Sequence, residues 1–140
     1  MRNLLKSERG SSWVELALVL PFFLFMIIGV VDLGRGYTTY VALTNSAREG
    51  ARWISTYPSD LSGAQTRILA EAARVHLGSA DLAISLTPAQ TSYNAGQSVT
   101  VSIGYDFPLT FLSTVNFVPN SLPTSIPLQA QATMRVLYDN

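Results

Sequence analysis

The chain has 140 residues, enough for one modest domain and a membrane segment. Nine Lys and Arg balance nine Asp and Glu, so the formal net charge is zero and no basic patch for nucleic acid is expected. The absence of cysteine excludes disulfides and thiolate chemistry.

The N-terminus joins a short, predominantly basic stub, residues 1–10, to a long segment without charges, residues 16–31. Glu15 lies at the start of the apolar segment, where a carboxylate is unfavourable unless a partner neutralises it. If the chain is cut after Gly10, the new α-amine of Ser11 would lie about one helical turn from Glu15. A positive amine and a negative side chain could then neutralise each other in lipid.

Residues 13–31 admit three interpretations. A transmembrane helix needs roughly 20 apolar residues, which this segment nearly supplies if Glu15 is paired or reaches the interface. A secretory signal peptide would be followed by a small-residue cleavage site, and none follows here. A buried helix of a soluble protein would show a polar face, which this segment lacks. We therefore expect a membrane helix, with the basic stub in the cytoplasm and the rest outside.

Apolar residues recur at helical spacing beyond this segment, which predicts one helix over about residues 12–56. Such a helix would be roughly 65 Å long, apolar all round in its first half and amphipathic in its second. Pro21 removes the backbone hydrogen bond to Ala17 and so predicts a kink. Three glycines near the outer membrane boundary are either ordinary constituents of a membrane helix or sites of local melting in a filament: Gly29, Gly34 and Gly36.

Two stretches of this helix have distinctive sequences. Residues 9–21 read Arg-Gly-Ser-Ser-Trp-Val-Glu-Leu-Ala-Leu-Val-Leu-Pro, and residues 45–52 read Asn-Ser-Ala-Arg-Glu-Gly-Ala-Arg. Both stretches resemble the motifs of TadE-like proteins, the minor pilins or pseudopilins of tight-adherence (Tad) pilus systems. The first also resembles the type IV prepilin signature, in which a basic leader ends in Gly. The second motif includes Ala47, Arg48, Glu49, Gly50, Ala51 and Arg52.

The resemblance implies that a prepilin peptidase removes the leader between Gly10 and Ser11. It also implies that Glu15 pairs with a Ser11 amine, in its own or a neighbouring subunit, although a solvated interfacial charge is the alternative. Other pilin subunits and the pilus assembly machinery would be partners, alongside the membrane. The precursor would lie in the cytoplasmic membrane, and the assembled subunit in a fimbrium at the cell surface, with roles in cell adhesion or secretion.

A second helix is predicted after a break at residues 57–60. Ser62 and Gln65 have the spacing of a capping box at its start. The helical pattern runs to about Leu77, and Gly78 is placed to terminate it.

The period of the pattern then changes from helical to two. Alternation over residues 82–87, 99–105 and 128–136 predicts three half-buried strands of an antiparallel sheet, with a turn at residues 94–96. The amphipathic part of the long helix is the natural cover for the apolar face of the sheet. The expected fold class is therefore α+β.

Between the last two strands, Phe107 to Ser125 forms a long apolar stretch broken by prolines. We expect either a loop that caps the core or an apolar docking surface for a neighbouring subunit.

The sequence offers no site for catalysis. His76 is the only histidine and lies near a helix end, the carboxylates lack metal-ligand spacing, and no serine has a nearby base. We therefore expect no catalytic residues, no metal, no cofactor and no small-molecule substrate, and a chain that is not an enzyme.

The chain is expected to divide into a leader at 1–10, a helix at 11–57 with its transmembrane part at 13–31, and an α+β head at 58–140.

Three functions stay open for a chain that is organised in this way. A minor pilin or pseudopilin is the first hypothesis and a main filament-forming pilin the second. The third is a permanent single-pass anchor that keeps its stub and binds an external partner through its head.

Overall fold

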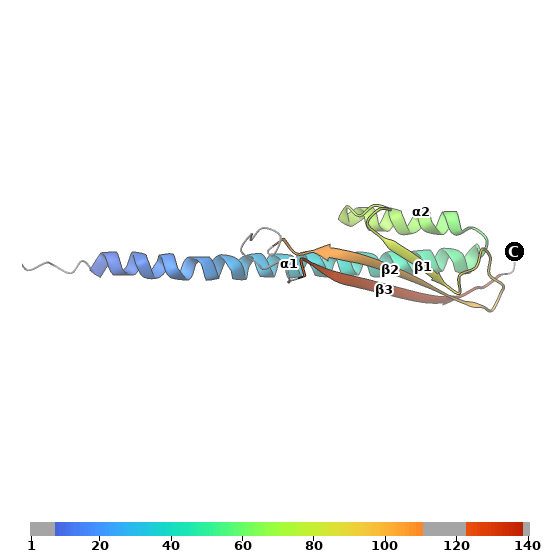
Figure 1. The fold of residues 1–140 in the computed structure, drawn as a ribbon. Helices are drawn as coiled ribbons and strands as arrows, with labels where there is room; N and C mark the ends of the chain where they lie inside the picture. The colour runs from blue at the N-terminus through green and yellow to red at the C-terminus, as the bar shows by residue number, and fades with distance from the viewer. Residues whose placement is uncertain (1–7, 111–122, 139–140) are drawn as a thin grey trace, which may run out of the picture.

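The computed structural model of the protein describes residues 8–110 and 123–138, and for residues 8–11 the backbone alone. The fold is α+β, as predicted, and Figure 1 shows the first half of a long helix projecting from a head that contains every other element. The elements are the helices α1 (Glu8–Thr56) and α2 (Leu61–Ala72), a 3-10 turn η1 (Ala73–Val75), and the strands β1 (Ala83–Thr87), β2 (Ser98–Pro108) and β3 (Ser125–Arg135).

Helix α1 has 49 residues and is about 73 Å long. The prediction of one helix across both the apolar and the amphipathic stretch is confirmed, with a start at Glu8, four residues earlier than expected. Pro21 lies inside the helix, which is continuous on both sides of it and through the three glycines near residue 32.

The sheet is an antiparallel meander in the order β1-β2-β3, as the alternation predicts. Val101 of β2 pairs with Leu86 on one side and Ala132 on the other, and Ile103 likewise lies between Ile84 and Ala130. These cross-strand sets share one face because side chains alternate along a strand. In β2 this face is buried at Val99, Val101 and Ile103.

The connection predicted from Phe107 to Ser125 is wrong at both ends. Phe107 is a residue of β2, paired with Ile126, and its side chain is buried. The physical reason is that Phe107 continues the two-residue period of Val101 and Ile103 on the same face of the sheet, so the strand runs on until Pro108. The middle of the predicted connection, residues 111–122, lies outside the described residues, and the choice between core cap and docking surface stays open there.

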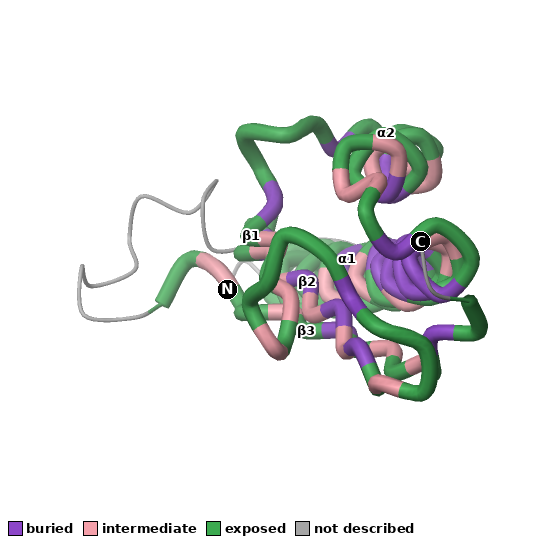
Figure 2. Tube along the Cα trace, turned by 90° about the vertical axis from the view of Figure 1, so that its right-hand side faces the viewer, coloured by how far each residue is buried: buried purple, intermediate pink, exposed green. Residues whose placement is uncertain are grey.

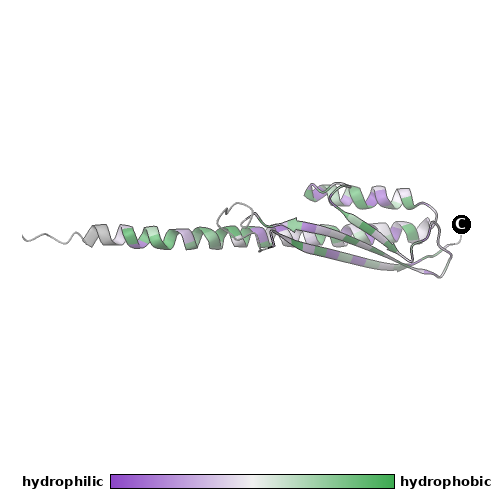
Figure 3. Ribbon diagram, viewed as in Figure 1, coloured by the Kyte–Doolittle hydropathy of each residue, from purple (hydrophilic) through white to green (hydrophobic). Residues whose placement is uncertain are grey.

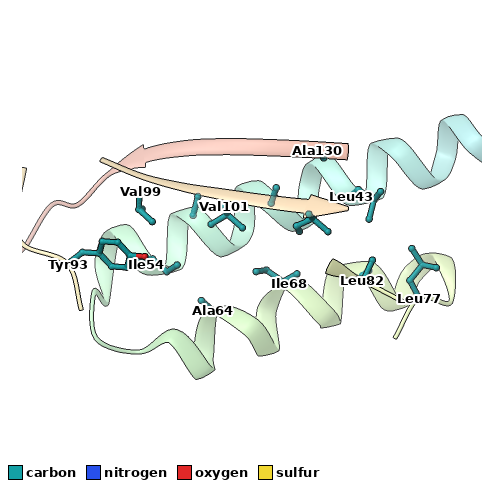
Figure 4. Packing of buried hydrophobic residues seen from close by; sticks show 14 of the residues in the cluster. Leu43, Ile54, Ala64, Ile68, Leu77, Leu82, Tyr93, Val99, Val101 and Ala130 are labelled. Carbon is teal, nitrogen blue, oxygen red and sulfur yellow. The ribbon is translucent and has the colours of Figure 1, made fainter. Parts of the chain in front are cut away.

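The amphipathic half of α1 forms the centre of the head. Figures 2 and 4 show α1 between α2 on one side and the strands β2 and β3 on the other. The predicted cover of the sheet by this helix is therefore confirmed. The core cluster draws on all three layers: Leu43, Ala47, Ala51 and Ile54 from α1; Ala64, Ile68 and Ala72 from α2; and Val99, Val101, Ile103 and Ala130 from the sheet.

The capping box predicted for the second helix is wrong. Asp60 is the N-cap, and its carboxylate accepts a 2.9 Å hydrogen bond from the backbone N–H of Gly63. Ser62 instead donates its hydroxyl to the same carboxylate at 2.9 Å. Aspartate and serine are about equally good N-caps. Asp60 ends the break at residues 57–60, and it therefore caps the helix two residues before Ser62, the predicted cap.

The end of the second helix also differs from the prediction. The α-helix ends at Ala72, and after η1 the residue in the left-handed region is His76, with φ 62°, rather than Gly78. The N–H of Leu77 donates to the carbonyl of Ala72. The N–H of Gly78 is held by the Asp81 carboxylate at 2.8 Å, so this glycine belongs to the following turn.

Candidate functional site

The N-terminal half of α1 exposes its apolar side chains without cover from the rest of the chain. Within Ser12–Thr56, an 18-residue window has a mean hydropathy of 2.6 and none of it is buried, so among the described residues one helix is long and apolar enough to cross a membrane. Figure 3 shows this half as predominantly hydrophobic. Large side chains such as Trp13, Leu18 and Phe22 are about 70% exposed (72%, 67% and 70%). Such a surface needs lipid or other helices around it.

Glu15 lies on this exposed half. Gly10 and Ser11 lie in the opening turns of α1, and Ser11 precedes Glu15 by four residues, a rise of about 6 Å along the axis. Residues i and i+4 of a helix face the same side. The part of the chain that the structure describes gives Glu15 no ion-pair partner.

An ion pair marks the point where the exposed half of α1 meets the head. Asp32 is 5% exposed, and its carboxylate lies 2.9 Å from Nη1 of Arg35, one helical turn later. The same Nη1 donates to the hydroxyl of Thr110. The Arg35 guanidinium lies 5.2 Å from the centroid of the Phe107 ring, within cation–π range. The junction therefore carries two charges that neutralise each other.

An apolar groove of about 590 Å³ opens beside this ion pair, between α1 and the end of the sheet. On α1 it is lined by Gly29, Asp32, Leu33, Gly36, Tyr37 and Tyr40. The strands supply Phe107, Ile126 and Leu128, and Leu109 follows β2. The aromatic ring of Phe107 approaches Gly36, where an added Cβ would lie 3.7 Å from the ring.

The second sequence motif lies inside the head, where it joins α1 to α2 and the sheet. Ala47 and Ala51 are fully buried in the core cluster. At Gly50 an added Cβ would lie 2.6 Å from two side-chain carbons of Ile68, so the glycine permits the close approach of α2. Small side chains on this face therefore have a packing role.

The charged residues of the motif lie at the edge of the same contact. Glu49 accepts two hydrogen bonds from the guanidinium of Arg52, at 2.8 and 3.0 Å, and lies 3.7 Å from Arg67 of α2. The hydrogen bond from Arg52 lowers the pKa of Glu49, and the positive charges of Arg52 and Arg67 add to this effect. Arg67 also lies 4.4 Å above the Trp53 ring. Arg48 is exposed on another face.

Asp60 connects the two helices through a polar contact that sequence reasoning missed. Besides capping α2, its carboxylate accepts a 3.0 Å hydrogen bond from the indole N–H of Trp53 on α1. The hydrogen bonds from Gly63, Ser62 and Trp53, in that order of size, hold the pKa of Asp60 below its ordinary value. An Asp before a helical pattern was a usable signal for the cap, whereas the contact with Trp53 depends on the fold.

The Asp32–Arg35 pair was also missed, although an acidic and a basic residue three positions apart on a predicted helix is a recognised pairing signal. The predicted processing and assembly residues stay on the projecting helix, and the second motif lies in the head, so the structure does not bring the two together. Among the described residues, no group of three or more His, Cys, Asp or Glu side chains could hold a metal ion.

A comparison with known families finds a match. The family model described as TadE-like protein matches residues 10–52, less than half of the chain but all of the segment that contains Gly10, Glu15 and the second motif. Comparisons with curated proteins and with solved structures gave no match. The TadE-like family is one of structural, pilin-like proteins related to Tad pili rather than enzymes. The match confirms the resemblance read from the two motifs: residues 10–52 are similar to TadE-like proteins.

Proposed function

We propose that the chain is a structural subunit of a tight-adherence type IV pilus, in the role of a minor pilin or pseudopilin. A prepilin peptidase removes residues 1–10 by cutting after Gly10, and the subunit assembles through the apolar half of α1. The precursor spans the cytoplasmic membrane once, with its N-terminus inside and its head outside. The division into leader, helix and head is part of this proposal.

One observation carries the proposal. A single helix joins an apolar half without intramolecular cover to a half that forms the core of a small head. The apolar half can exchange lipid for the helices of other subunits, because either surrounding satisfies it equally well. A subunit that passes from a membrane into a filament needs this property.

Glu15 is the proposed assembly residue. An unpaired carboxylate at the membrane centre costs about 3 kcal/mol on insertion scales, and less near the interface. Pairing with the Ser11 amine of a neighbouring subunit removes this cost and so favours one axial position. About 3 kcal/mol corresponds to roughly two orders of magnitude in the equilibrium, since each 1.4 kcal/mol is a factor of ten.

The first test is Glu15→Ala. We expect the variant to insert into the membrane but to give no filaments, because the pairing charge is lost. Asp106→Ala, which removes an exposed carboxylate from the head, is the matched control and should assemble normally. Filament yield in sheared surface fractions is the measurement, and a normal yield from Glu15→Ala would refute the pairing role.

The second test addresses the cut. Gly10→Val should remain as uncut precursor, because the peptidase is expected to require the glycine before the cut. Gly29→Val, where an added side chain meets open space, is the control and should still be processed. If Gly10→Val is processed to the same mature mass as the wild type, cleavage does not depend on Gly10, and its proposed role in processing is refuted.

The two other hypotheses give different results. A main filament-forming pilin would dominate the other pilins in the sheared fraction, whereas a minor pilin would be scarce there. A permanent anchor would keep Met1 on the working protein. N-terminal sequencing of the chain from native membranes separates the anchor from both pilin roles.

A further inference from the structure

One face of α1 is covered by the sheet in the head and then continues past the end of the sheet. Within the head this face carries Leu43, Ala47 and Ile54, all fully buried. Toward the N-terminus the same helical spacing of three and four residues leads through Tyr40, Gly36, Leu33 and Gly29. These four residues line the apolar groove, so the groove is the uncovered continuation of the core-facing stripe.

The groove is strongly apolar and open to the surroundings of the protein. Leu33 is 77% exposed, Tyr37 71% and Tyr40 46%. On the opposite wall, Ile126 at the start of β3 is 46% exposed. A contiguous apolar surface of this kind marks an interaction site.

The position of the groove along α1 indicates what covers it. Residues 13–31 rise by about 28 Å, close to the roughly 30 Å hydrocarbon thickness of a bilayer. If these residues cross the bilayer, the groove at residues 29–40 lies at the outer boundary between hydrocarbon and headgroups. Tyrosines are enriched at this depth because the ring is apolar and the hydroxyl is polar, and Tyr37 and Tyr40 are both there.

The charges at the groove fit the same depth. Asp32 and Arg35 form a 2.9 Å ion pair, and the Asp32 side chain is 5% exposed. A neutralised pair is far less costly near hydrocarbon than two separate charges. The groove also continues directly into the apolar half of α1, where Val30 and Val31 are both exposed, and the one carboxylate between them and Leu33, that of Asp32, is buried and paired with Arg35.

We infer that, in the membrane-inserted subunit, phospholipids of the outer leaflet fill this groove and seat the base of the head in the membrane interface. The inference rests on the proposed membrane insertion and concerns the subunit before assembly. Tyr37, Tyr40 and Ile126 then act as interfacial anchors that fix how far the head stands from the bilayer.

The absence of cysteine from the chain allows a direct test of depth with single nitroxide labels. The full-length chain is placed in vesicles of phosphatidylethanolamine and phosphatidylglycerol, with a label at Ile126→Cys in the groove. Ile27→Cys on the apolar half of α1 is the lipid reference, and Leu137→Cys beyond β3, 62% exposed, is the water reference. Oxygen, which concentrates in lipid, and a water-soluble nickel chelate compete to relax each label.

We expect the oxygen-to-nickel ratio at residue 126 to be several-fold higher than at residue 137 and lower than at residue 27. In the Tyr37→Ser/Tyr40→Ser double variant this ratio should fall several-fold, whereas Tyr138→Ser, which removes an exposed tyrosine remote from the groove, should leave it unchanged. Circular dichroism checks that each variant keeps its helix and sheet.

Three outcomes would overturn the inference. If residues 126 and 137 give equal ratios while residue 27 is in lipid, the head does not touch the bilayer, although membrane insertion stands. If residue 27 is also accessible to the nickel chelate, insertion itself fails. If residue 126 is shielded from both reagents and its spectrum shows spin–spin broadening, a second copy of the chain fills the groove in place of lipid.

Discussion

Gly50 lies where α1 meets both α2 and β2. A Cβ built on it would lie 2.6 Å from Cδ1 and Cγ1 of Ile68 and 3.6 Å from Cγ1 of Val101. Real Cβ atoms do not approach other atoms as closely as 2.6 Å, so any larger residue forces α2 outward or Ile68 into another rotamer. The glycine of the second motif is thus explained by packing in the head.

Gly50→Ala is therefore expected to destabilise the head. Helix propensity favours alanine over glycine by up to about 1 kcal/mol, but overpacking typically costs about 1–3 kcal/mol and should win. Thermal unfolding of the full chain in detergent, followed by circular dichroism, measures the effect. Gly34→Ala is the matched control, because nothing lies within 4 Å of its added Cβ, and it should not lower the midpoint.

A double-mutant cycle locates the clash. Ile68→Ala alone should cost about 2–5 kcal/mol, as expected for a buried large-to-small substitution. On that background Gly50→Ala should cost nothing further, since the two carbons that it meets are gone. Full additivity of the two substitutions would show that Gly50 is needed for another reason.

Asp60 also makes the stability of the folded chain depend on pH. Its pKa is lowered in the folded chain by hydrogen bonds from the Gly63 amide, the Ser62 hydroxyl and the Trp53 indole. The unfolded chain therefore binds a proton more readily, so the stabilisation by Asp60 is fully present above its ordinary pKa of about 3.9 and is lost as the pH falls through the lower, folded value.

Asp60→Ala should accordingly lower the unfolding temperature at neutral pH. The difference from the wild type should shrink below about pH 4, where the unfolded carboxyl is already protonated. Asp60→Asn keeps a side-chain oxygen for the N-cap but does not titrate. Wild type and Asp60→Asn should therefore converge in acid, and a gap that is constant with pH would contradict the role of the Asp60 charge.

At the scale of elements, α1 is one helix in two environments. Its first half has exposed apolar side chains all round, and its second half supplies the middle layer of the head. Pro21 lies in the first half and provides no N–H to the carbonyl of Ala17. This carbonyl has no donor from residue 21, so we expect the backbone there to open more easily than in the second half.

Pro21→Ala should restore that hydrogen bond. We expect slower amide hydrogen exchange in peptides covering residues 17–25 of the chain in detergent micelles, because opening now breaks one more bond. Peptides covering residues 43–54 serve as the internal control and should exchange as in the wild type. Unchanged exchange at residues 17–25 would mean that Pro21 does not weaken the helix.

The helix and strands whose apolar residues repeat with a clear period were predictable from the sequence. The long helix and the three strands follow from periods of 3.6 and 2 in the apolar residues, and the structure has them with shifted ends. The ends were less predictable, because Asp60 and Ser62 are both good caps and only the folded chain selects between them. The groove and the place of Gly50 could not be predicted, since they depend on which elements meet in space.

At the scale of the whole molecule, the core cluster begins at Leu43. The described residues before it contribute no side chain to this cluster, so the head should not depend on the apolar half of α1 for its stability. The remaining part of α1, α2 and the sheet together form a three-layer unit with its own core.

A chain that begins at residue 33 should therefore fold in water without detergent. We expect cooperative thermal unfolding by circular dichroism and a midpoint close to that of the full chain in micelles, because the core is complete. Leu43→Ala in the shortened chain is the control and should lower the stability by about 2–5 kcal/mol. Non-cooperative unfolding of the unmutated shortened chain would show that the apolar half of α1 is part of the folding unit.

The core cluster starts at Leu43, whereas residues 12–28 are exposed and contact none of it. This separation has a mechanical consequence. A force that pulls the chain lengthwise out of a bilayer acts along α1, whose C-terminal half is packed between α2 and the sheet. The helix transmits the pull to the head, and no tertiary contact of the cluster has to break while residues 12–28 change their surroundings. For a membrane-inserted subunit we therefore expect extraction to break contacts between α1 and lipid while the head stays folded.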